Sequence, residues 1–408
     1  MNTDKPQAKS SSLAKSVKVV LTFIFLWQGF LWYVNSTDLP SVATFSFEEH
    51  TTSLGYPFLN YSVVTQDGYI LSVYRIPGKT WNSSRNPPVL LIHGLSNSAH
   101  CFILNQCSTA PAFKLAEEGY DVWLGNLRGN HLSRQHLNLT EEQEEYWDWS
   151  FPEVIHNDLP AFVKFVKSET GYEKIVMLGH SMGGAAVLWM LAEAPEMAED
   201  VALGVAVGSP GGVILSGSYY LNFLSLSLVQ NFWKFLGVRV ISDWTDDLFL
   251  AKFVHTFQGL SSLIAKDLYD MELVGGKSKY LSTYLHRIRG GTSLQNLVFW
   301  SQVKANKLAN PKLYDYGTQT NLEKYGTEEP PVVDFKKIRT KVAVFNGKYD
   351  KAVPKESSEV LKNSLPQEYL VHYSDGYLQD HAGFLFSCKM DYFEDLLKVV
   401  SNALPNNN

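Results

Sequence analysis

The sequence predicts an α/β fold: a mostly parallel central sheet, covered by helices on both faces and interrupted by an inserted helical cap, or lid. Short apolar runs typical of buried strands alternate with segments whose apolar residues recur at helical spacing. This alternation stops between residues 211 and 310 and then resumes. We therefore expect a core formed by 45–210 and 311–408, a cap at 211–310, and an N-terminal segment, 1–44, that lies outside the fold.

The first part of the expected core opens with a hairpin. Residues 62–76 alternate β-branched and aromatic residues around Asp67-Gly68, which is a strong hairpin signal. The following elements are a strand at 87–94, a helix and a strand within 108–130, a helix at 158–171, a strand at 173–179, a helix from about Gly183 and a strand at 201–210. Strands that alternate with helices in this way favour parallel pairing.

The second part of the core repeats the pattern, with strands at 341–347 and 369–374 and a last helix at 392–404. Between the two parts, residues 219–238, 248–271 and 292–311 look helical, with no strand among them. The aromatic-rich stretch 219–236 predicts a lid helix over an acyl-chain pocket that also touches lipid interfaces. Most of its residues are nevertheless expected to pack against neighbouring cap helices.

Composition limits the possible functions. The chain is 45% hydrophobic and 19% charged, as in an ordinary globular protein with ample material for a core. A formal net charge of −6 and the absence of a basic stripe argue against nucleic-acid binding.

The N-terminus is expected to carry a targeting signal, with a buried core helix as the disfavoured alternative. A lysine-rich segment precedes the apolar run Val19–Val34. As a helix this run would be roughly 24 Å long, a little short of a ~30 Å bilayer core, and no clear small-residue cleavage site follows it. A cleaved signal peptide and a retained signal anchor both remain open. Either places the body in the secretory pathway: secreted, in a lysosome-like lumen, or anchored by a single span with the catalytic body lumenal or extracellular.

Sequons and cysteines are consistent with that route. N-glycosylation sequons begin at Asn35, Asn60, Asn82 and Asn138. The cysteines are Cys101, Cys107 and Cys388, so at most one intramolecular disulfide can form. Cys101 and Cys107 could pair in an oxidising lumen, and three free thiols are the alternative.

A Gly-flanked serine joins a buried strand to a helix. Residues 179–183, Gly-His-Ser-Met-Gly, fit the G-x-S-x-G pattern of a nucleophile elbow. The chain must turn sharply at Ser181, and Gly179 and Gly183 leave room where strand and helix approach each other. The turn raises the hydroxyl above the sheet beside the N–H groups of a helix N-terminus. This context favours a catalytic nucleophile over a glycine-rich turn that merely contains a serine.

A serine hydroxyl needs a general base and a carboxylate that orients the base. On this architecture the partners follow in the order acid, then histidine, on loops after later strands. Of the 11 histidines, His381 is the one in the loop after the last strand, 369–374. Asp350 lies in the loop after the strand before it, 341–347. Asp380 is the competing acid, but side chains adjacent in the chain rarely meet at the imidazole Nδ1. We expect the triad Ser181, Asp350 and His381.

An oxyanion requires two preorganised donors. One is expected to be the backbone N–H of Met182, directly after the nucleophile. The other is expected to be the N–H of Leu95, in the turn shaped by His93 and Gly94 after the strand at 87–94. A plain turn that ends a strand is the alternative for His93-Gly94.

With these residues in place, the chain resembles the acid lipase family, which includes gastric and lysosomal acid lipases. The resemblance runs from about Thr52 to Ser401 and rests on several strings that recur in order: GYPFLNYSVVTQDGYILSVYRIP, GYDVWLGNLRGN, NDLPAF, GHSMGG and GGTSLQN. It implies an α/β-hydrolase core with a helical cap, and hydrolysis of lipid esters without cofactor or metal. We expect a lipid substrate at a membrane, droplet or micelle interface, and neither a nucleic acid nor an obligate protein as partner.

The chain departs from the family pattern in two places. Met182 stands where the family has Gln, which a backbone donor should tolerate. The cap contains no Cys, so the disulfide associated with the cap of gastric lipase is missing.

The leading hypothesis is a serine lipase or esterase that acts on triacylglycerols or sterol esters through an acyl-enzyme on Ser181. A small-ester esterase, an acyltransferase or a peptidase on the same scaffold remains possible. A non-catalytic binding protein is disfavoured by the complete triad. Epoxide hydrolase and dehalogenase chemistry is disfavoured because those enzymes have Asp at the elbow.

Overall fold

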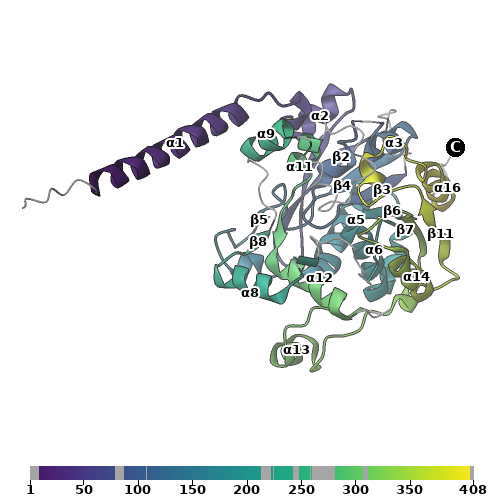
Figure 1. Ribbon diagram of the computed structural model, residues 1–408. Helices are drawn as coiled ribbons and strands as arrows, with labels where there is room; N and C mark the ends of the chain where they lie inside the picture. The colour runs from purple at the N-terminus through teal and green to yellow at the C-terminus, as the bar shows by residue number, and fades with distance from the viewer. Residues whose placement is uncertain are drawn as a thin grey trace, which may run out of the picture.

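In the computed structural model, one central sheet is surrounded by helices (Figure 1). Within the part of the chain that the structure describes, this sheet has nine strands. Their order is β1-β2-β4-β3-β6-β7-β10-β11, with β5 beside β2. The strands are β1 Leu59–Val64, β2 Tyr69–Ile76, β3 Pro88–Ile92, β4 Asp121–Gly125, β5 Gln135–His136, β6 Ile175–His180, β7 Val201–Val207, β10 Lys341–Gly347 and β11 Leu370–Tyr377. The structure describes residues 9–78, 87–106, 108–212, 222–223, 225–241, 248–257, 259, 281–306 and 311–404.

Strand direction follows the sequence pattern. The predicted hairpin is confirmed: β1 and β2 pair antiparallel, with Leu59 opposite Arg75, and Gly68 in the turn adopts a φ of 97°. Strand β2 also pairs antiparallel with β4, whereas every pair from β4 through β3, β6, β7 and β10 to β11 is parallel. The carboxyl ends of β3, β6, β10 and β11 therefore meet at one edge of the sheet, where loops from distant parts of the chain come together.

Helices cover both faces of the sheet. Leu90 and Ile92 of β3 belong to one hydrophobic cluster, while the alternate residues Val89 and Leu91 belong to another, so the two clusters lie on opposite faces. The first cluster includes residues of α5 (Leu159–Thr170), α6 (Met182–Glu193) and α14 (Lys355–Ser364). The second includes residues of α3 (Pro111–Glu117) and α16 (Phe393–Ala403). This two-sided burial explains why the parallel strands are apolar at nearly every position.

The region between β7 and β10 contains a helix within each of the three predicted helical stretches, and one unexpected strand pair. Its helices are α8 (Ser227–Phe235), α9 (Leu248–Thr256), α11 (Leu281–Arg287), α12 (Leu294–Asn306) and α13 (Thr318–Tyr325). The expectation of a block without strands is wrong, because β8 (Val240–Ile241) pairs antiparallel with β9 (Thr292–Ser293). Two-residue strands are too short to give an alternating pattern. Part of the predicted lid helix 219–236 lies outside the described residues. Residues 258 and 260–271 of the predicted helix at 248–271 lie outside the described residues as well.

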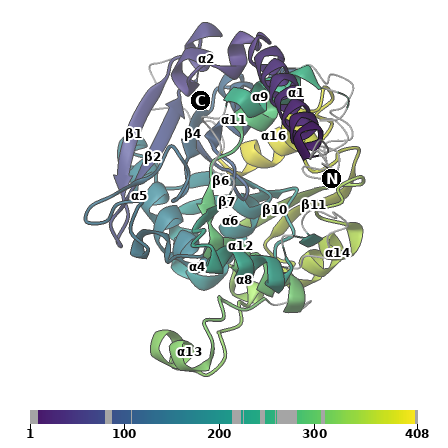
Figure 2. The same cartoon turned by 60° about the vertical axis from the view of Figure 1, so that its left-hand side comes forward.

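The N-terminal segment is a helix that contacts the body by its last turn. Helix α1 (Lys9–Asn35) projects from the body beside α9 (Figures 1 and 2). Phe30 stacks on Phe257, with ring centroids 6.0 Å apart, and Val34 is fully buried. The end of this segment is therefore part of the packed structure, contrary to the expectation that all of 1–44 lies outside the fold. Within the described residues, no helix is both long and apolar enough to span a bilayer.

Both alternatives for the cysteines are wrong. Cys101 is a buried free thiol, and burial raises its pKa well above the ordinary value. Cys388 is disulfide-bonded, and position 107 lies outside the described residues. Nearby, the Asn105 side chain donates to the carbonyl oxygen of Ser387 at 3.0 Å, so the loop after β3 contacts the segment after α15 (Gly383–Phe386).

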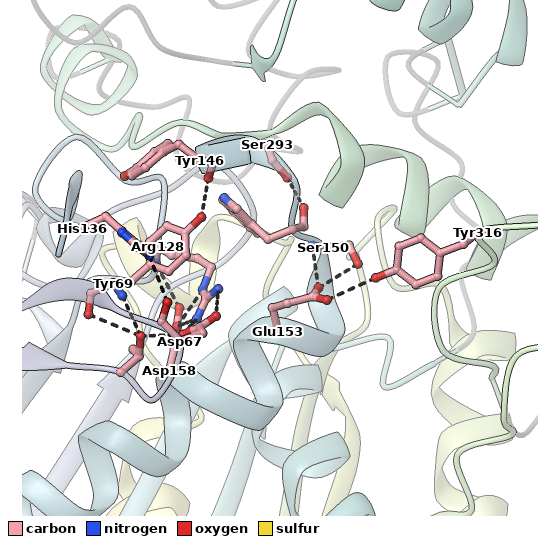
Figure 3. Close-up of polar contacts among 12 residues, drawn as sticks. Asp67, Tyr69, Arg128, His136, Tyr146, Ser150, Glu153, Asp158, Ser293 and Tyr316 are labelled. Carbon is pink, nitrogen blue, oxygen red and sulfur yellow. Dashed lines mark hydrogen bonds and ion pairs between the residues drawn. The ribbon is translucent and has the colours of Figure 1, made fainter. Parts of the chain in front are cut away.

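A buried arginine organises the loop after β4. The guanidinium of Arg128 is fully buried and pairs with Asp158 at 2.7 Å and with Asp67 at 2.6 Å (Figure 3). It also lies 4.1 Å from the ring centroid of Tyr69. Asp158 ends a π-helical turn, Val154–Asp158, that joins α4 (Phe151–Glu153) to α5. Although burial alone would lower the pKa of Arg128, its two carboxylate partners raise it, so the cation is permanent.

Replacing Arg128 with methionine should destabilise the fold by about 3–5 kcal/mol, because it leaves the fully buried Asp158 carboxylate without a cation. The free energy of unfolding in urea measures the loss. Lys398→Met is the matched control, since its pair with Asp395 is exposed and should contribute at most about 1 kcal/mol. Equal effects of the two substitutions would show that the buried pair is not a structural anchor.

Candidate active site

The nucleophile elbow forms at the junction of β6 and α6. Ser181 adopts φ 56° and ψ −121°, a conformation that costs a non-glycine residue backbone strain. A Cβ atom at Gly183 would lie 2.2 Å from the carbonyl oxygen of Ile92, and one at Gly179 would lie 2.1 Å from the carbonyl carbon of Gly183. Both positions are therefore closed to any larger residue. The sequence prediction of two space-making glycines agrees with this packing.

The structure brings Ser181, His381 and Asp350 into one hydrogen-bonded chain. The Oγ of Ser181 lies 3.0 Å from His381 Nε2, and His381 Nδ1 lies 3.0 Å from Asp350 Oδ2. The other carboxylate oxygen of Asp350 accepts the backbone N–H of Val353 at 2.7 Å. The Asp350 side chain is fully buried, whereas that of His381 keeps 17% of its surface exposed. A buried acid thus fixes the imidazole, and the imidazole faces the hydroxyl.

Asp380, the competing acid, accepts a hydrogen bond from the backbone of the following segment. Its Oδ1 accepts the backbone N–H of Gly383 at 2.7 Å, at the start of α15. The carboxylate therefore caps the helix that follows the histidine loop, and Asp350 is the acid on His381 Nδ1.

Two backbone segments flank the serine hydroxyl. Met182 is the first residue of α6, so its N–H has no acceptor within the helix. On the other side, the turn after β3 passes so close that a Cβ at Gly94 would lie 3.1 Å from Ser181 Cβ. Leu95 follows in the same turn, and Ser96 has a φ of 54°. Both expected oxyanion donors thus belong to segments beside the nucleophile.

The turn that contains Leu95 is held from two sides. The side chain of Asn130 donates to the carbonyl oxygen of Asn97 at 2.6 Å, and the backbone N–H of Gly290 donates to that of Ser96 at 2.7 Å. A Cβ at Gly290 would lie only 1.9 Å from the Asn97 oxygen. The roles of Asn130 and Gly290 are not predicted from the sequence, although both residues lie in strings that carry the family resemblance.

His93 connects two backbone segments of the site. Its Nε2 accepts the backbone N–H of Leu127 at 3.1 Å, so the proton sits on Nδ1, which lies 2.9 Å from the carbonyl oxygen of Gly94. The ring therefore joins the turn after β3 to the loop after β4. Burial lowers the pKa of His93 to about 4, which keeps the imidazole neutral in this role.

Residues of the cap region cover the oxyanion turn and the side chain of Met182. Leu294 and Leu297 of α12 form a small apolar cluster, and Leu95, Trp233 of α8 and Ile241 of β8 each pack against it. The amide nitrogen of Asn296 lies 3.7 Å from the Met182 sulfur. Among the described residues, no three His, Cys, Asp or Glu side chains gather in a way that could hold a metal ion.

Comparison with known proteins agrees with this geometry. Residues 87–381 match the family described as "alpha/beta hydrolase fold", and residues 47–106 match the "Partial alpha/beta-hydrolase lipase region". Gastric triacylglycerol lipase of Homo sapiens is 32% identical over 372 residues, which is 88% of this chain and 91% of the relative. The chain belongs to the α/β-hydrolase lipase family.

Other members of this family are similar over comparable lengths. Lipase member K of Mus musculus is 30% identical over 377 residues, covering 89% of this chain and 93% of the relative. Lipase lipl-1 of Caenorhabditis elegans is 30% identical over 370 residues, covering 86% and 90%. The predicted family and α/β-hydrolase fold are thereby confirmed.

The neutral histidines of the site predict that acid destabilises the fold. Burial lowers the pKa of His93 to about 4 and that of His180 to about 3, against ~6.5 for an unfolded chain. At a pH between the folded-state and the unfolded-state pKa of each histidine, the unfolded chain binds more protons than the folded one. The free energy of unfolding is therefore highest above pH ~6.5 and falls as the pH decreases. Urea unfolding should show a loss of about 2 kcal/mol for each of the two histidines from pH 7.5 to pH 5.

The same measurement between pH 7.5 and 8.5, where neither histidine titrates in either state, serves as the control and should give a nearly constant stability. A stability maximum near pH 5 would contradict the assignment of neutral imidazoles.

Proposed function

We propose that this chain is a serine lipase or esterase that hydrolyses carboxylic esters of apolar lipids through an acyl-enzyme on Ser181. The observation that supports this most directly is the continuous hydrogen-bonded chain from Ser181 Oγ through His381 to Asp350, at 3.0 Å for each contact. Such a chain activates a hydroxyl that is otherwise a weak nucleophile near neutral pH.

In the acylation step, Ser181 Oγ attacks the ester carbonyl carbon while His381 Nε2 takes the hydroxyl proton. Asp350 Oδ2 accepts a hydrogen bond from the Nδ1–H of His381 without taking the proton, which holds the tautomer and stabilises the imidazolium that forms. The negative charge on the carbonyl oxygen is met by the N–H groups of Met182 and Leu95. As the tetrahedral intermediate collapses, the ester C–O bond breaks and His381 returns its proton to the leaving alcohol.

Deacylation repeats these steps with water. His381 Nε2 takes a proton from the water molecule as its oxygen attacks the acyl carbon, and the intermediate collapses to free carboxylic acid. The same proton then returns to Ser181 Oγ. Only these residues and water are required, because no bond is oxidised or reduced.

An apolar, interfacial substrate is supported by the outer surface of the cap. In α8, Leu228 is 80%, Phe232 56% and Phe235 84% exposed, and their spacing puts them along one side of the helix. Such an exposed apolar stripe fits contact with a membrane, droplet or micelle surface. Since a relative at 32% identity is a triacylglycerol lipase, triacylglycerols and sterol esters are the proposed substrates.

The proposed route is the secretory pathway, with the mature chain secreted or in a lysosome-like lumen. The sequon residues Asn35, Asn60 and Asn138 are exposed, and Asn82 lies outside the described residues. The disulfide of Cys388 also fits an oxidising compartment.

Purified protein should hydrolyse p-nitrophenyl esters of long acyl chains faster than the acetate, and Ser181→Ala should lower kcat by at least about 1,000-fold. The reason is that the substitution removes the attacking oxygen. Ser168→Ala, on an exposed position of α5, is the matched control and should keep full activity.

The assay covers acidic and neutral pH with detergent present. Activity that survives Ser181→Ala would refute the serine mechanism. Preference for acetate or butyrate would point to a small-ester esterase, and an inactive wild type would support a non-catalytic binding protein.

Protein expressed in animal cells should carry N-glycans on its exposed sequons, because these side chains are accessible during passage through the endoplasmic reticulum. Treatment with peptide N-glycosidase F should increase gel mobility, and Asn60→Gln and Asn138→Gln should each remove part of that shift. Ser62→Ala breaks the Asn60 sequon in another way and should reproduce the effect of Asn60→Gln. A chain whose mobility does not change with the glycosidase would contradict the secretory assignment.

A further inference from the structure

The variable residue of the elbow, His180, lies beside the proposed base. Its Nε2 is 3.0 Å from the backbone carbonyl oxygen of His381, and the two ring centroids are 5.0 Å apart. Only 3% of His180 is exposed. His180 occupies the first variable position of the G-x-S-x-G motif, and the catalytic steps above do not use it.

We propose that His180 is a positioning residue, whose Nε2–H donates to the His381 carbonyl and holds the base at the level of Ser181 Oγ. The inference rests on the proposed serine mechanism. A carbonyl oxygen can only accept, so Nε2 must carry the proton. The bond joins the residue directly before the nucleophile to the backbone of the base, which lies 201 positions further along the chain. The end of β6, which carries His180, and the segment that carries His381 are thereby tied together.

The position of His381 in the fold shows why such a tie matters. The residue lies between the end of β11 at Tyr377 and the start of α15 at Gly383, in a segment that is itself neither strand nor helix. Asp350 fixes the direction of the imidazole through Nδ1, but not the height of the backbone that carries it. A bond to the His381 carbonyl supplies that second restraint. Since errors of about 1 Å can cost about 100-fold in rate, the restraint bears directly on proton transfer.

The surroundings of His180 suit a neutral donor. Burial, followed by the charge of His381, lowers the pKa of His180 to about 3. The ring therefore stays uncharged while His381 becomes an imidazolium during catalysis, and two adjacent cations are avoided. Gly208, at φ 54°, borders the ring: a Cβ there would lie 3.4 Å from His180 Nε2 and 3.5 Å from Asp350 Oδ2. Gly208 thus lies beside both the His180 ring and the triad acid.

The alternative hypothesis is that His180 only fills space. Substitutions that keep or remove the hydrogen-bond donor distinguish this hypothesis from a positioning role. Glutamine carries an N–H₂ donor at nearly the reach of Nε2, whereas leucine fills comparable space without any donor. A positioning residue requires the donor, and a filling residue requires only the volume.

The experiment compares wild type, His180→Gln and His180→Leu on one long-chain p-nitrophenyl ester. We expect His180→Leu to lower kcat by about 10- to 100-fold with KM within about twofold, because proton transfer suffers and substrate binding does not. His180→Gln should recover kcat to within about fivefold of wild type. The acid limb of the pH profile of kcat/KM should stay in place in both variants, since a neutral His180 does not titrate there.

His50→Leu is the matched control. His50 lies in α2 (Phe47–Ser53), is 4% exposed and stacks on Phe113, away from the triad. It should lower the melting temperature while kcat stays at the wild-type value. If His180→Leu fails to fold, His180→Asn takes its place, because the shorter amide keeps a polar group but cannot reach the carbonyl.

A second readout is independent of ester turnover: the rate at which a fluorophosphonate probe modifies Ser181, followed by intact mass. Full kcat in His180→Leu, or equal losses in the Gln and Leu variants, would overturn the positioning role while leaving the serine mechanism intact. A wild type that reacts with the probe but hydrolyses no ester would overturn the proposed function, and the variant series on the probe would still decide the role of His180. A wild type that does neither overturns both.

Discussion

The close approach of β6, α6 and β3 at the nucleophile elbow is the constraint on which the site depends. Ser181 can hold a φ of 56° only because the surrounding packing fixes its neighbours, with Gly183 pressed against the carbonyl oxygen of Ile92. That contact also determines where the turn after β3 begins. The nucleophile, the helix N-terminus and the second oxyanion segment are therefore placed by one packing contact between three backbone segments.

The loops around the elbow are irregular but are tied together by buried polar groups. His93 joins the turn after β3 to the loop after β4, and Asn130 in that loop holds the carbonyl of Asn97. The loop after β4 is itself anchored by Arg128 on Asp158. Buried charges are costly unless they are paired, so this anchor favours a single arrangement of the loop. Rigidity at the oxyanion turn thus follows from an ion pair that touches neither nucleophile nor base.

Much of this arrangement could be predicted from local sequence patterns, and the part that could not depends on distant contacts. The hairpin around Gly68, the buried strands and the order of serine, acid and histidine each leave a signal within a short stretch. The pairing of Arg128 with Asp158, 30 positions apart, leaves none, and neither does the disulfide of Cys388. The two-residue strands β8 and β9 are too short for periodicity. The motif gives no role for His180, because it indicates which histidine can be the base and not which histidine positions the base.

Three histidines at the site have different roles because their burial differs. His93 and His180 are almost wholly buried, and burial lowers their pKa values to about 4 and about 3, so they act as neutral hydrogen-bonding groups. His381 keeps 17% of its side chain exposed and lies against the buried carboxylate of Asp350, which stabilises its charged form. Proton transfer at the site is thereby confined to one imidazole. The cost is a fold that loses stability in acid, since the two buried rings must remain uncharged where an unfolded chain would protonate them.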